Sequence, residues 1–328
     1  MINLNDNKNQ EDFFMLKIGL VGVGGISGAH IPAWEEMNDA ELVALCDIRP
    51  ERMEKYGTKR CYTDFDEMLE KEELDILDIC LPTYLHADFA IKAMNKGINV
   101  ITEKPISLNE SDVERVYSAA EKNNVKFMVA QVLRFWPEYE VLKEIYDSKK
   151  YGKLLSGSMI RLGSCPKWTW DDWMVDEKRS GLTPFDLHIH DLDFMVYAFG
   201  KPEVTHQFRS KRPEQDFISI DYDFGEFSIH SEASWYSSTF PFTAEFRFQF
   251  ENAVITNKNE KMIIYLKDDE KIDLSQQAEG DTGNINLPKS NAYANEINYF
   301  ADCVRNNKPV EIIKPDELSC VLNILNSL

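Results

Sequence analysis

The chain has 328 residues and lacks any uninterrupted apolar run of the about 18 residues that a membrane-spanning helix needs. Its first residues, MINLNDNKNQEDFF, also lack the basic and apolar regions of a secretion signal. Met15 stands just before the first apolar run, so we expect residues 1–15 to form an N-terminal extension. These absences predict a protein without a membrane partner.

Basic residues are scarce: Lys and Arg sum to 36, Asp and Glu to 56, and the formal net charge is −20. A strongly acidic protein repels phosphate backbones and anionic lipid surfaces, which argues against nucleic acid and membranes as partners. A surplus of this size also serves solubility alone. The charge therefore excludes classes of partner without indicating a function.

The six cysteines lack any C-x-x-C pair. Two of them, Cys46 and Cys80, lie inside apolar runs, where buried thiols are common. The pattern favours free thiols in a reducing compartment, so we expect a cytoplasmic location.

What the chain does contain is typical of a folded protein, with 43% hydrophobic residues, and at roughly 150 residues per domain its length indicates about two domains. The first 130 residues alternate short apolar runs with helical patterns, which is typical of a parallel sheet. We expect strands at residues 16–21, 42–47, 76–80, 98–102 and 125–130. A helix is expected around residues 113–120, where apolar residues share one face, and another should begin at Pro137.

Beyond about residue 150 the pattern changes to period-two alternation, as in Ile218, Ile220 and Tyr222. Such alternation predicts a sheet with one buried face. Residues 256–291 are polar and contain glycine, so we interpret them as hairpin and loop, and apolar spacing predicts two closing helices around 293–304 and 318–325. The sequence thus predicts an α/β protein: a doubly wound parallel sheet, then an α/β domain with an open, mostly antiparallel sheet.

The first expected strand runs into GVGGISG at residues 22–28, a G-x-G-x-x-G pattern with Ser27 at the third glycine position. Gly22 permits a tight turn, Gly24 lets the backbone approach a pyrophosphate, and a small residue at 27 lets the helix pack on the strand. The start of that helix offers N–H groups to phosphates. Because the motif follows a strand and opens a helix, it predicts a dinucleotide site; the alternative is a plain connecting turn.

Asp47 stands at the end of the second expected strand, where a carboxylate accepts hydrogen bonds from both ribose hydroxyls of an adenosine. It would also repel a 2′-phosphate, which favours NAD over NADP. Arg49 leaves the choice open, because a guanidinium can stack on adenine or hold a 2′-phosphate.

Glu103-Lys104-Pro105 follows the strand at 98–102. The carboxyl ends of parallel strands are where doubly wound sheets bind ligands, so Lys104 is expected beside the nicotinamide. Its ammonium can donate a proton or stabilise an alkoxide. The alternative is a solvated surface lysine paired with Glu103.

Residues 181–200 predict a helix that begins near Pro184 and ends at Gly200. Asp186 and His190 are i and i+4 and therefore share one face, where the carboxylate can orient the imidazole as a general base. The alternatives are a capping carboxylate and a core histidine. His188 is i+2 from both and points elsewhere, so we expect no metal site.

The loop before this helix carries three tryptophans and two aspartates, including Trp168 and Trp173. Aromatic faces with nearby carboxylates suit a polyhydroxylated ring. Loop packing or a subunit contact is an equal alternative. Leu81, Thr83 and His86 end the strand at 76–80 and are expected to border the cofactor, although His86 could equally be structural.

Together these residues resemble the glucose–fructose oxidoreductase, inositol dehydrogenase and rhizopine catabolism family (Gfo/Idh/MocA). The similar segments are GLVGVGGISGAH, CDIRPER, CLPTYLHADFA, ITEKPIS and GLTPFDLHIHDLDFMVYAFG. The resemblance covers about residues 16–328. It implies an NAD(P)-binding Rossmann domain at 16–134 and a substrate-binding and oligomerisation α/β domain at 135–328, assembled as a homodimer or homotetramer.

By position, the resemblance implies three sets of site residues. The catalytic residues are Lys104, Asp186 and His190. The expected cofactor-binding residues are Gly22, Gly24, Gly25, Ile26, Asp47, Arg49, Leu81, Thr83, His86, Glu103, Lys104 and Gln131. The expected substrate-binding residues are Arg134, Trp168, Trp173, Asp186 and His190. His188 stands where the family often has glycine, which implies a reshaped pocket.

The leading hypothesis is hydride transfer between NAD and a secondary alcohol of a sugar or an inositol-like polyol. His190 takes the hydroxyl proton while Lys104 stabilises the alkoxide, or Lys104 is itself the base. Two alternatives stay open: an NAD-dependent glycoside hydrolase of the same family, with no net redox change, and a non-catalytic nucleotide-sensing regulator.

Overall fold

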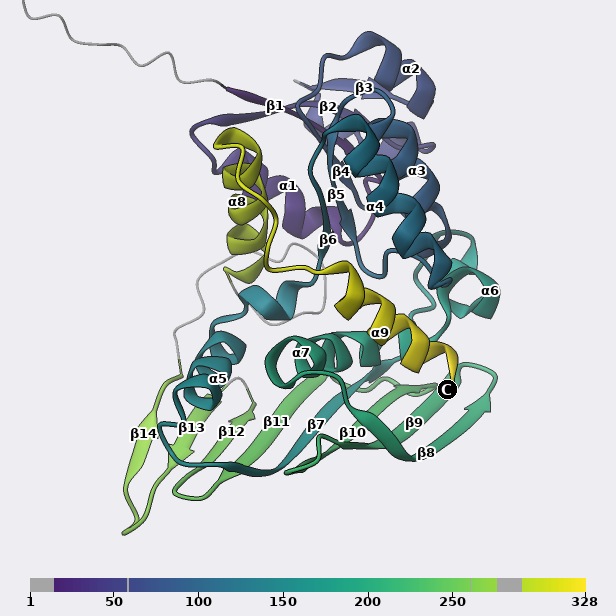
Figure 1. Ribbon diagram of the computed structural model, residues 1–328. Coiled ribbons are helices and arrows are strands. Elements are labelled where there is room, and N and C mark those ends of the chain that lie inside the picture. The colour runs from purple at the N-terminus through teal and green to yellow at the C-terminus, as the bar shows by residue number, and fades with distance from the viewer. Residues whose placement is uncertain (1–14, 58, 260, 276–290) are drawn as a thin grey trace, which may run out of the picture.

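The computed structural model describes residues 15–57, 59–259, 261–275 and 291–328. Within these ranges the chain forms two sheets, one of six strands and one of eight, which lie in the upper and lower parts of Figure 1. The expected extension before Met15 and much of the polar stretch 256–291 lie outside the described residues. The α/β fold class with two different sheets is confirmed.

The first sheet is parallel and has the order β3-β2-β1-β4-β5-β6. Its strands are β1 (Leu16–Val21), β2 (Ala40–Cys46), β3 (Arg60–Tyr62), β4 (Ile76–Ile79), β5 (Asn99–Glu103) and β6 (Phe127–Ala130). The chain reverses direction across the sheet between β1 and β4, so the carboxyl ends of these two central strands flank a crevice. The apolar runs predicted five of the strands; β3 was missed because its three residues are polar or exposed.

Helices connect these strands. They are α1 (Ser27–Glu35), α2 (Phe65–Lys71), α3 (His86–Met94) and α4 (Ser111–Asn123), with short turns η1 (Pro50–Arg52), η2 (Glu54–Tyr56), η3 (Thr83–Leu85) and η4 (Val132–Phe135). In α4 the predicted apolar face is buried at Val113, Val116 and Ala120. The strands therefore have buried helix faces against them, as a doubly wound sheet requires.

The second sheet has the order β14-β13-β12-β11-β7-β10-β9-β8. Its strands are β7 (Leu154–Ser164), β8 (Glu203–Arg212), β9 (Gln215–Asp223), β10 (Ser228–Tyr236), β11 (Thr243–Phe250), β12 (Val254–Lys258), β13 (Lys261–Tyr265) and β14 (Lys271–Asp273). Among the described strands of this second sheet, only the β7–β10 pair is parallel. The prediction of a mostly antiparallel sheet is confirmed, and so is a hairpin in the polar stretch after residue 256.

One face of this sheet is covered by α5 (Pro137–Ser148), the turn η6 (Pro184–His188) and α7 (Ile189–Phe199) (Figure 1). The short elements η5 (Trp170–Val175) and α6 (Glu177–Ser180) precede η6, and α6 packs against η3. In β9, the alternating residues Ile218, Ile220 and Tyr222 are buried on this face. No helix of the described residues covers the opposite face in Figure 1.

The two C-terminal helices return toward the first sheet. α8 (Ala292–Arg305) packs against α1, and α9 (Pro315–Asn326) packs against α7 and α4 (Figure 1). A single cluster of buried side chains runs through both parts of the molecule. The division at residue 134 stays a prediction, because residues after it contribute to the packing of both sheets.

None of the helices in the described ranges combines the length and the apolar character that crossing a membrane requires. The six cysteines are free, and four of them are buried: Cys46, Cys80, Cys165 and Cys303. Burial is the main cause that raises the pKa of the Cys46 and Cys80 thiols to about 12. These two side chains are therefore neutral parts of the core.

Candidate active site

A cleft of about 1600 Å³ lies at the carboxyl edge of the parallel sheet and is lined by residues from both parts of the chain. The predicted site residues that line it are Gly22, Gly24, Gly25, Ile26, Asp47, Arg49, Leu81, Thr83, His86, Glu103, Lys104, Trp168, Trp173, Asp186 and His190. Residues far apart in the sequence thus share one cavity.

The glycine turn is shaped to receive a ligand along its backbone. Gly22 has φ +93°, and a Cβ there would lie 2.5 Å from the carbonyl oxygen of Cys80, so only glycine fits. At Gly24 no described atom lies within 4 Å of a Cβ position, which leaves its backbone open toward the cleft. The Ser27 hydroxyl donates to the Gly24 carbonyl at 2.9 Å. This open turn at the start of α1 fits a pyrophosphate.

Asp47 is held in the turn by three donors. Its carboxylate accepts from the backbone N–H groups of Val23 at 2.8 Å and Arg49 at 2.9 Å. The Arg49 guanidinium also donates to it at 3.2 Å. The carboxylate is therefore fixed at the end of β2, where it can accept from ribose hydroxyls, and Arg49 lies directly beside it.

His86 joins the ends of two strands. Its two ring nitrogens lie 2.6 Å from the carbonyl oxygens of Leu81 and Pro105, and burial lowers the pKa of this histidine. His86 thereby fixes the segments after β4 and β5, and Thr83 begins the short turn η3 between them. Both residues line the cleft.

Lys104 reaches from the parallel sheet to the second part of the chain. Its Nζ donates to the backbone carbonyl of Asp186 at 2.7 Å and lies 3.4 Å from the Asp186 carboxylate. Its backbone N–H donates to the Glu103 carboxylate at 3.0 Å. The lysine side chain is only 13% exposed, so it is not the solvated surface lysine of the alternative interpretation.

Asp186 and His190 lie in the same cleft, but their predicted pairing is wrong. The Asp186 carboxylate contacts Lys104 and accepts from the Trp235 indole at 3.2 Å. No hydrogen bond in the described part of the molecule reaches the His190 ring. The reason is that Pro184–His188 forms a π turn before α7, and a wider turn breaks the i, i+4 register of an α-helix.

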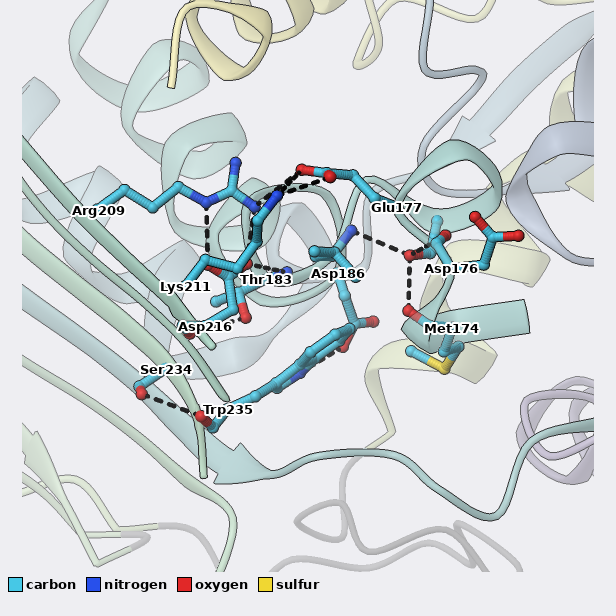
Figure 2. A network of polar contacts seen from close by, with 12 residues as sticks. Met174, Asp176, Glu177, Thr183, Asp186, Arg209, Lys211, Asp216, Ser234 and Trp235 are labelled. Atoms are coloured by element: carbon cyan, nitrogen blue, oxygen red, sulfur yellow. Dashed lines mark hydrogen bonds and ion pairs between the residues drawn. The ribbon is translucent and has the colours of Figure 1, made fainter. Parts of the chain in front are cut away.

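The anchoring of this π turn is visible in Figure 2. The Thr183 hydroxyl donates to the backbone carbonyl of Asp216 at 3.0 Å, and its N–H donates to the Asp216 carboxylate. Arg209 holds that carboxylate in turn, at 2.8 and 2.9 Å. Figure 2 also shows the Trp235 indole lying against Asp186. The turn is thus tied to β9 and β10. The Thr183 side chain does not cap the backbone N–H groups at the start of this turn.

His190 is a neutral imidazole at the cleft. Burial, then the ammonium of Lys104 and the guanidinium of Arg161, hold the pKa of His190 well below its usual value. A neutral ring can accept a proton near neutral pH. The neutral His190 ring and the Lys104 ammonium therefore line the same cleft.

Two predicted site residues do not line the cleft. Arg134 was expected to contact substrate, but its guanidinium is fully buried and bonds Asp193 at 2.7 and 2.8 Å and Glu317 at 2.5 Å. Arg134 therefore forms structural ion pairs that join η4 to α7 and α9. Gln131 is also buried, at the end of β6, and is absent from the cleft lining of the described residues.

A buried charge cluster behind Glu103 was not predicted. His30 of α1 is fully buried, and its ring nitrogens lie 2.9 Å from Asp78 and 3.1 Å from Glu103. Burial acts to lower the pKa of His30, but interactions with Asp78 and Cys80 together outweigh burial, so this pKa lies well above the ordinary value. His30, Asp78 and Cys80 lie close enough together to ligate a metal, but both His30 nitrogens already face carboxylates.

His188 is also structural. Its Nε2 lies 2.6 Å from the Tyr222 hydroxyl and its Nδ1 lies 3.3 Å from the Ser231 hydroxyl. Burial lowers the pKa of His188 to about 3, so the ring is neutral. The sequence could not assign this role, since both partners come from distant strands.

Trp235, Arg161 and Tyr293 line the cleft although the sequence did not single them out as site residues. Trp235 lies in β10. Its indole N–H bonds a predicted catalytic residue through a contact 49 residues away in the chain, and no local pattern encodes such a contact.

Comparison with known proteins identifies the chain's family. Residues 16–131 match the model described as "Oxidoreductase family, NAD-binding Rossmann fold", and residues 139–256 match the GFO/IDH/MocA C-terminal domain. The chain belongs to the GFO/IDH/MocA oxidoreductase family.

Curated relatives include myo-inositol 2-dehydrogenase of Thermotoga maritima, which is 30% identical over 191 residues, and glucose-6-phosphate 3-dehydrogenase of Bacillus subtilis, 28% identical over 207 residues. These alignments cover 57% and 60% of this chain, and 55% and 57% of the relatives. The chain is thus aligned to little more than half the length of each.

Solved structures extend the similarity over the whole fold. An oxidoreductase from Agrobacterium radiobacter in complex with NAD+, L-tartaric acid and magnesium has a TM-score of 0.78 at 17% identity, covering 95% of this chain and 94% of that one. Myo-inositol 2-dehydrogenase from Lactobacillus plantarum has a TM-score of 0.77 at 20% identity, with 95% and 96% coverage. At these identities the likeness establishes the fold.

Proposed function

We propose that the protein is an NAD-dependent dehydrogenase that acts on a secondary alcohol of a sugar or an inositol-like polyol. The observation that carries the proposal is the meeting of Lys104, Asp186 and His190 in the cleft that also holds the glycine turn. Relatives named as inositol and sugar dehydrogenases support the substrate class. Bound NAD supplies the nicotinamide that accepts the hydride.

In this proposal the chain's own residues move the proton and stabilise charge. Neutral His190 accepts the proton of the substrate hydroxyl at a ring nitrogen. The Lys104 ammonium, oriented by the Asp186 carbonyl at 2.7 Å, stabilises the alkoxide as it forms. Asp186, fixed by the Trp235 indole, keeps Lys104 in position and accepts from substrate hydroxyls.

We infer NAD rather than NADP because Asp47 presents a carboxylate where a 2′-phosphate would stand. Arg49 is bonded to that carboxylate, which leaves less of its charge for a phosphate. We further place the protein in the cytoplasm, since its six thiols are free.

We also propose a homodimer or homotetramer that assembles through the second sheet. The face without covering helices in the described chain carries Phe208, which is 55% exposed, and the neighbouring ring of Phe217. Apolar rings on an uncovered sheet face favour an interface.

The function is tested with a panel of inositols, sugars and their keto forms, monitored by NADH absorbance with NAD and, in parallel, with NADP. Turnover of at least one polyol or sugar with NAD is expected. An aryl glycoside is included in the panel, and release of its aglycone without NADH accumulation would instead favour the glycoside hydrolase. Tight NAD binding without turnover on any compound would favour the nucleotide-sensing regulator.

A further inference from the structure

Four large apolar side chains are exposed at the dinucleotide end of the cleft. Ile48 is 62% exposed, Tyr84 39%, Trp168 69% and Trp170 39%, and all four line the cavity. An exposed indole leaves a large apolar surface in water, and several such side chains around one hollow are typical of a ligand site. This rim is therefore expected to be covered by a flat, partly apolar ligand.

The two tryptophans come from the second part of the chain but contact the glycine turn and its surroundings. The Trp168 ring lies over Gly25, so that a Cβ on Gly25 would stand 3.2 Å from it. The centroid of the Trp170 ring lies 5.9 Å from Cζ of Arg49. We call residues 165–175 the aromatic strap, because they reach across the cleft to the parallel sheet.

The aromatic strap is held in this position by ion pairs. Arg179 donates to the Asp171 carboxylate at 2.8 Å and to the Asp171 carbonyl at 2.7 Å, and it pairs with Asp176 at 3.0 Å. Lys167 pairs with Glu214 on the opposite side. α6, which carries Arg179, packs against η3 of the parallel sheet. The indoles are thus placed before any ligand binds, which reduces the entropy lost on binding.

We propose that Trp168 and Trp170 bind the dinucleotide: Trp168 covers the pyrophosphate and ribose over Gly24 and Gly25, and Trp170 with Arg49 encloses the adenine. This inference rests on the proposed function and replaces the expectation that Trp168 contacts the substrate. An indole stacks on a heteroaromatic base and offers one N–H donor to a phosphate oxygen.

The charge arrangement favours adenine at this end of the cleft. The guanidinium of Arg49 lies between the Asp47 carboxylate and the Trp170 ring, so it can stack on a base while Asp47 accepts from the ribose. A neutral sugar has no extended π face to use both the indole and the guanidinium. The strap's contacts are with Gly25 and Arg49, which belong to the predicted cofactor site.

The test measures binding of ADP-ribose and NAD by titration calorimetry and by quenching of tryptophan fluorescence. ADP-ribose lacks the nicotinamide, so its affinity is independent of hydride transfer. Trp168→Ala and Trp170→Ala are each expected to weaken both ligands by about tenfold. Trp168→Phe, which keeps an aromatic face, is expected to retain more affinity than Trp168→Ala.

The matched control is Val175→Ala, which changes an exposed apolar side chain of the same strap outside the cleft lining. It should bind ADP-ribose with the wild-type affinity. Trp168 is 69% exposed, so Trp168→Ala should unfold at the wild-type temperature. Wild-type affinity for ADP-ribose in both tryptophan variants would overturn this inference alone, whereas a wild-type protein that binds neither ligand would overturn the proposed function as well.

Discussion

Lys104 and His190 have an electrostatic relation that a pH profile can measure. Burial and the ammonium of Lys104 hold the pKa of His190 well below the ordinary imidazole value, and only the neutral ring accepts a proton. Activity is therefore expected to stay constant around neutral pH and to fall in acid, as His190 becomes protonated.

Lys104→Met removes the charge and keeps most of the side-chain length. We expect kcat/KM to fall by about 10²–10⁴-fold, the usual contribution of such a group. We also expect the acid limb of the profile to move to higher pH, because the pKa of His190 rises when the neighbouring cation is lost. Lys178→Met is the control, because the exposed side chain of Lys178 lies outside the cleft lining. An acid limb at the wild-type pH would contradict the proposed coupling.

His30 gives a second prediction at this scale, in the stability of the fold. His30→Gln leaves Asp78 and Glu103 without the cation that neutralises them in the core. Removing one partner of a buried pair costs about 3–5 kcal/mol, so the free energy of unfolding should fall by that order. Exposed Lys96, just after α3, provides the control substitution Lys96→Gln.

The pH dependence of this loss has a definite sign. The pKa of His30 is raised in the folded protein by Asp78 against the opposing effect of burial. Its stabilisation is therefore complete below the unfolded value near 6.5 and is lost as the pH rises through the folded value. In urea unfolding, the difference between wild type and His30→Gln should be larger at about pH 6 than at about pH 9. A difference that grows with pH would contradict the assignment.

At the scale of single elements, the sequence predicted what short patterns encode. β1 was predicted with its observed bounds, and α5 begins at Pro137 as expected, because alternation, apolar runs and proline act locally. Gly22, Asp47 and Lys104 were found in the cleft for the same reason: each follows directly on a strand.

The elements that were missed depend on distant contacts. The π turn at Pro184–His188 is fixed by Asp216 and Trp235 on other strands, so the helical pattern alone wrongly paired Asp186 with His190. Arg134 was wrongly expected in the cleft. The residues that bind its guanidinium, Asp193 and Glu317, lie 59 and 183 residues away in the sequence. A single sequence does not reveal such pairs.

The prediction at this scale concerns how α7 is held. Two of its acidic residues are buried against arginines, Asp191 with Arg161 and Asp193 with Arg134. Asp193→Ala leaves the Arg134 guanidinium buried without that partner, so the free energy of unfolding should fall by about 3–5 kcal/mol. The exposed i, i+4 pair of Lys143 and Asp147 offers the control Asp147→Ala. This substitution should change the free energy of unfolding by about 0.5 kcal/mol or less.

A double variant separates charge from packing. Arg134→Met with Asp193→Leu removes both charges and keeps apolar volume, and it should lose less stability than Asp193→Ala. Urea unfolding of the double variant, Asp193→Ala and the control Asp147→Ala measures the order of their free energies of unfolding. If the double variant is the least stable, hydrogen bonding by the pair, including Arg134 to the Ile312 carbonyl, outweighs the burial of charge.

At the scale of the whole molecule, the site exists only because two sheets meet. Lys104 ends a strand of the parallel sheet, and Asp186 and His190 come from the segment that covers the second sheet. α8 and α9 fasten the two parts, since they pack on α1, α4 and α7. The cleft is therefore expected to be lost in any variant that separates the parts, even when each sheet still forms.

The uncovered face of the second sheet gives the last prediction. Phe208 pairs with Ser219 across β8 and β9, so its ring stands on the same face as Phe217, opposite the buried Ile218 and Ile220. Sedimentation of the wild type is expected to give a dimer or tetramer. Phe208→Glu places a charge in that interface and should shift the equilibrium toward the monomer at equal concentration. Phe208→Leu, which stays apolar, should keep the assembly, and a wild-type monomer at high concentration would contradict the proposed interface.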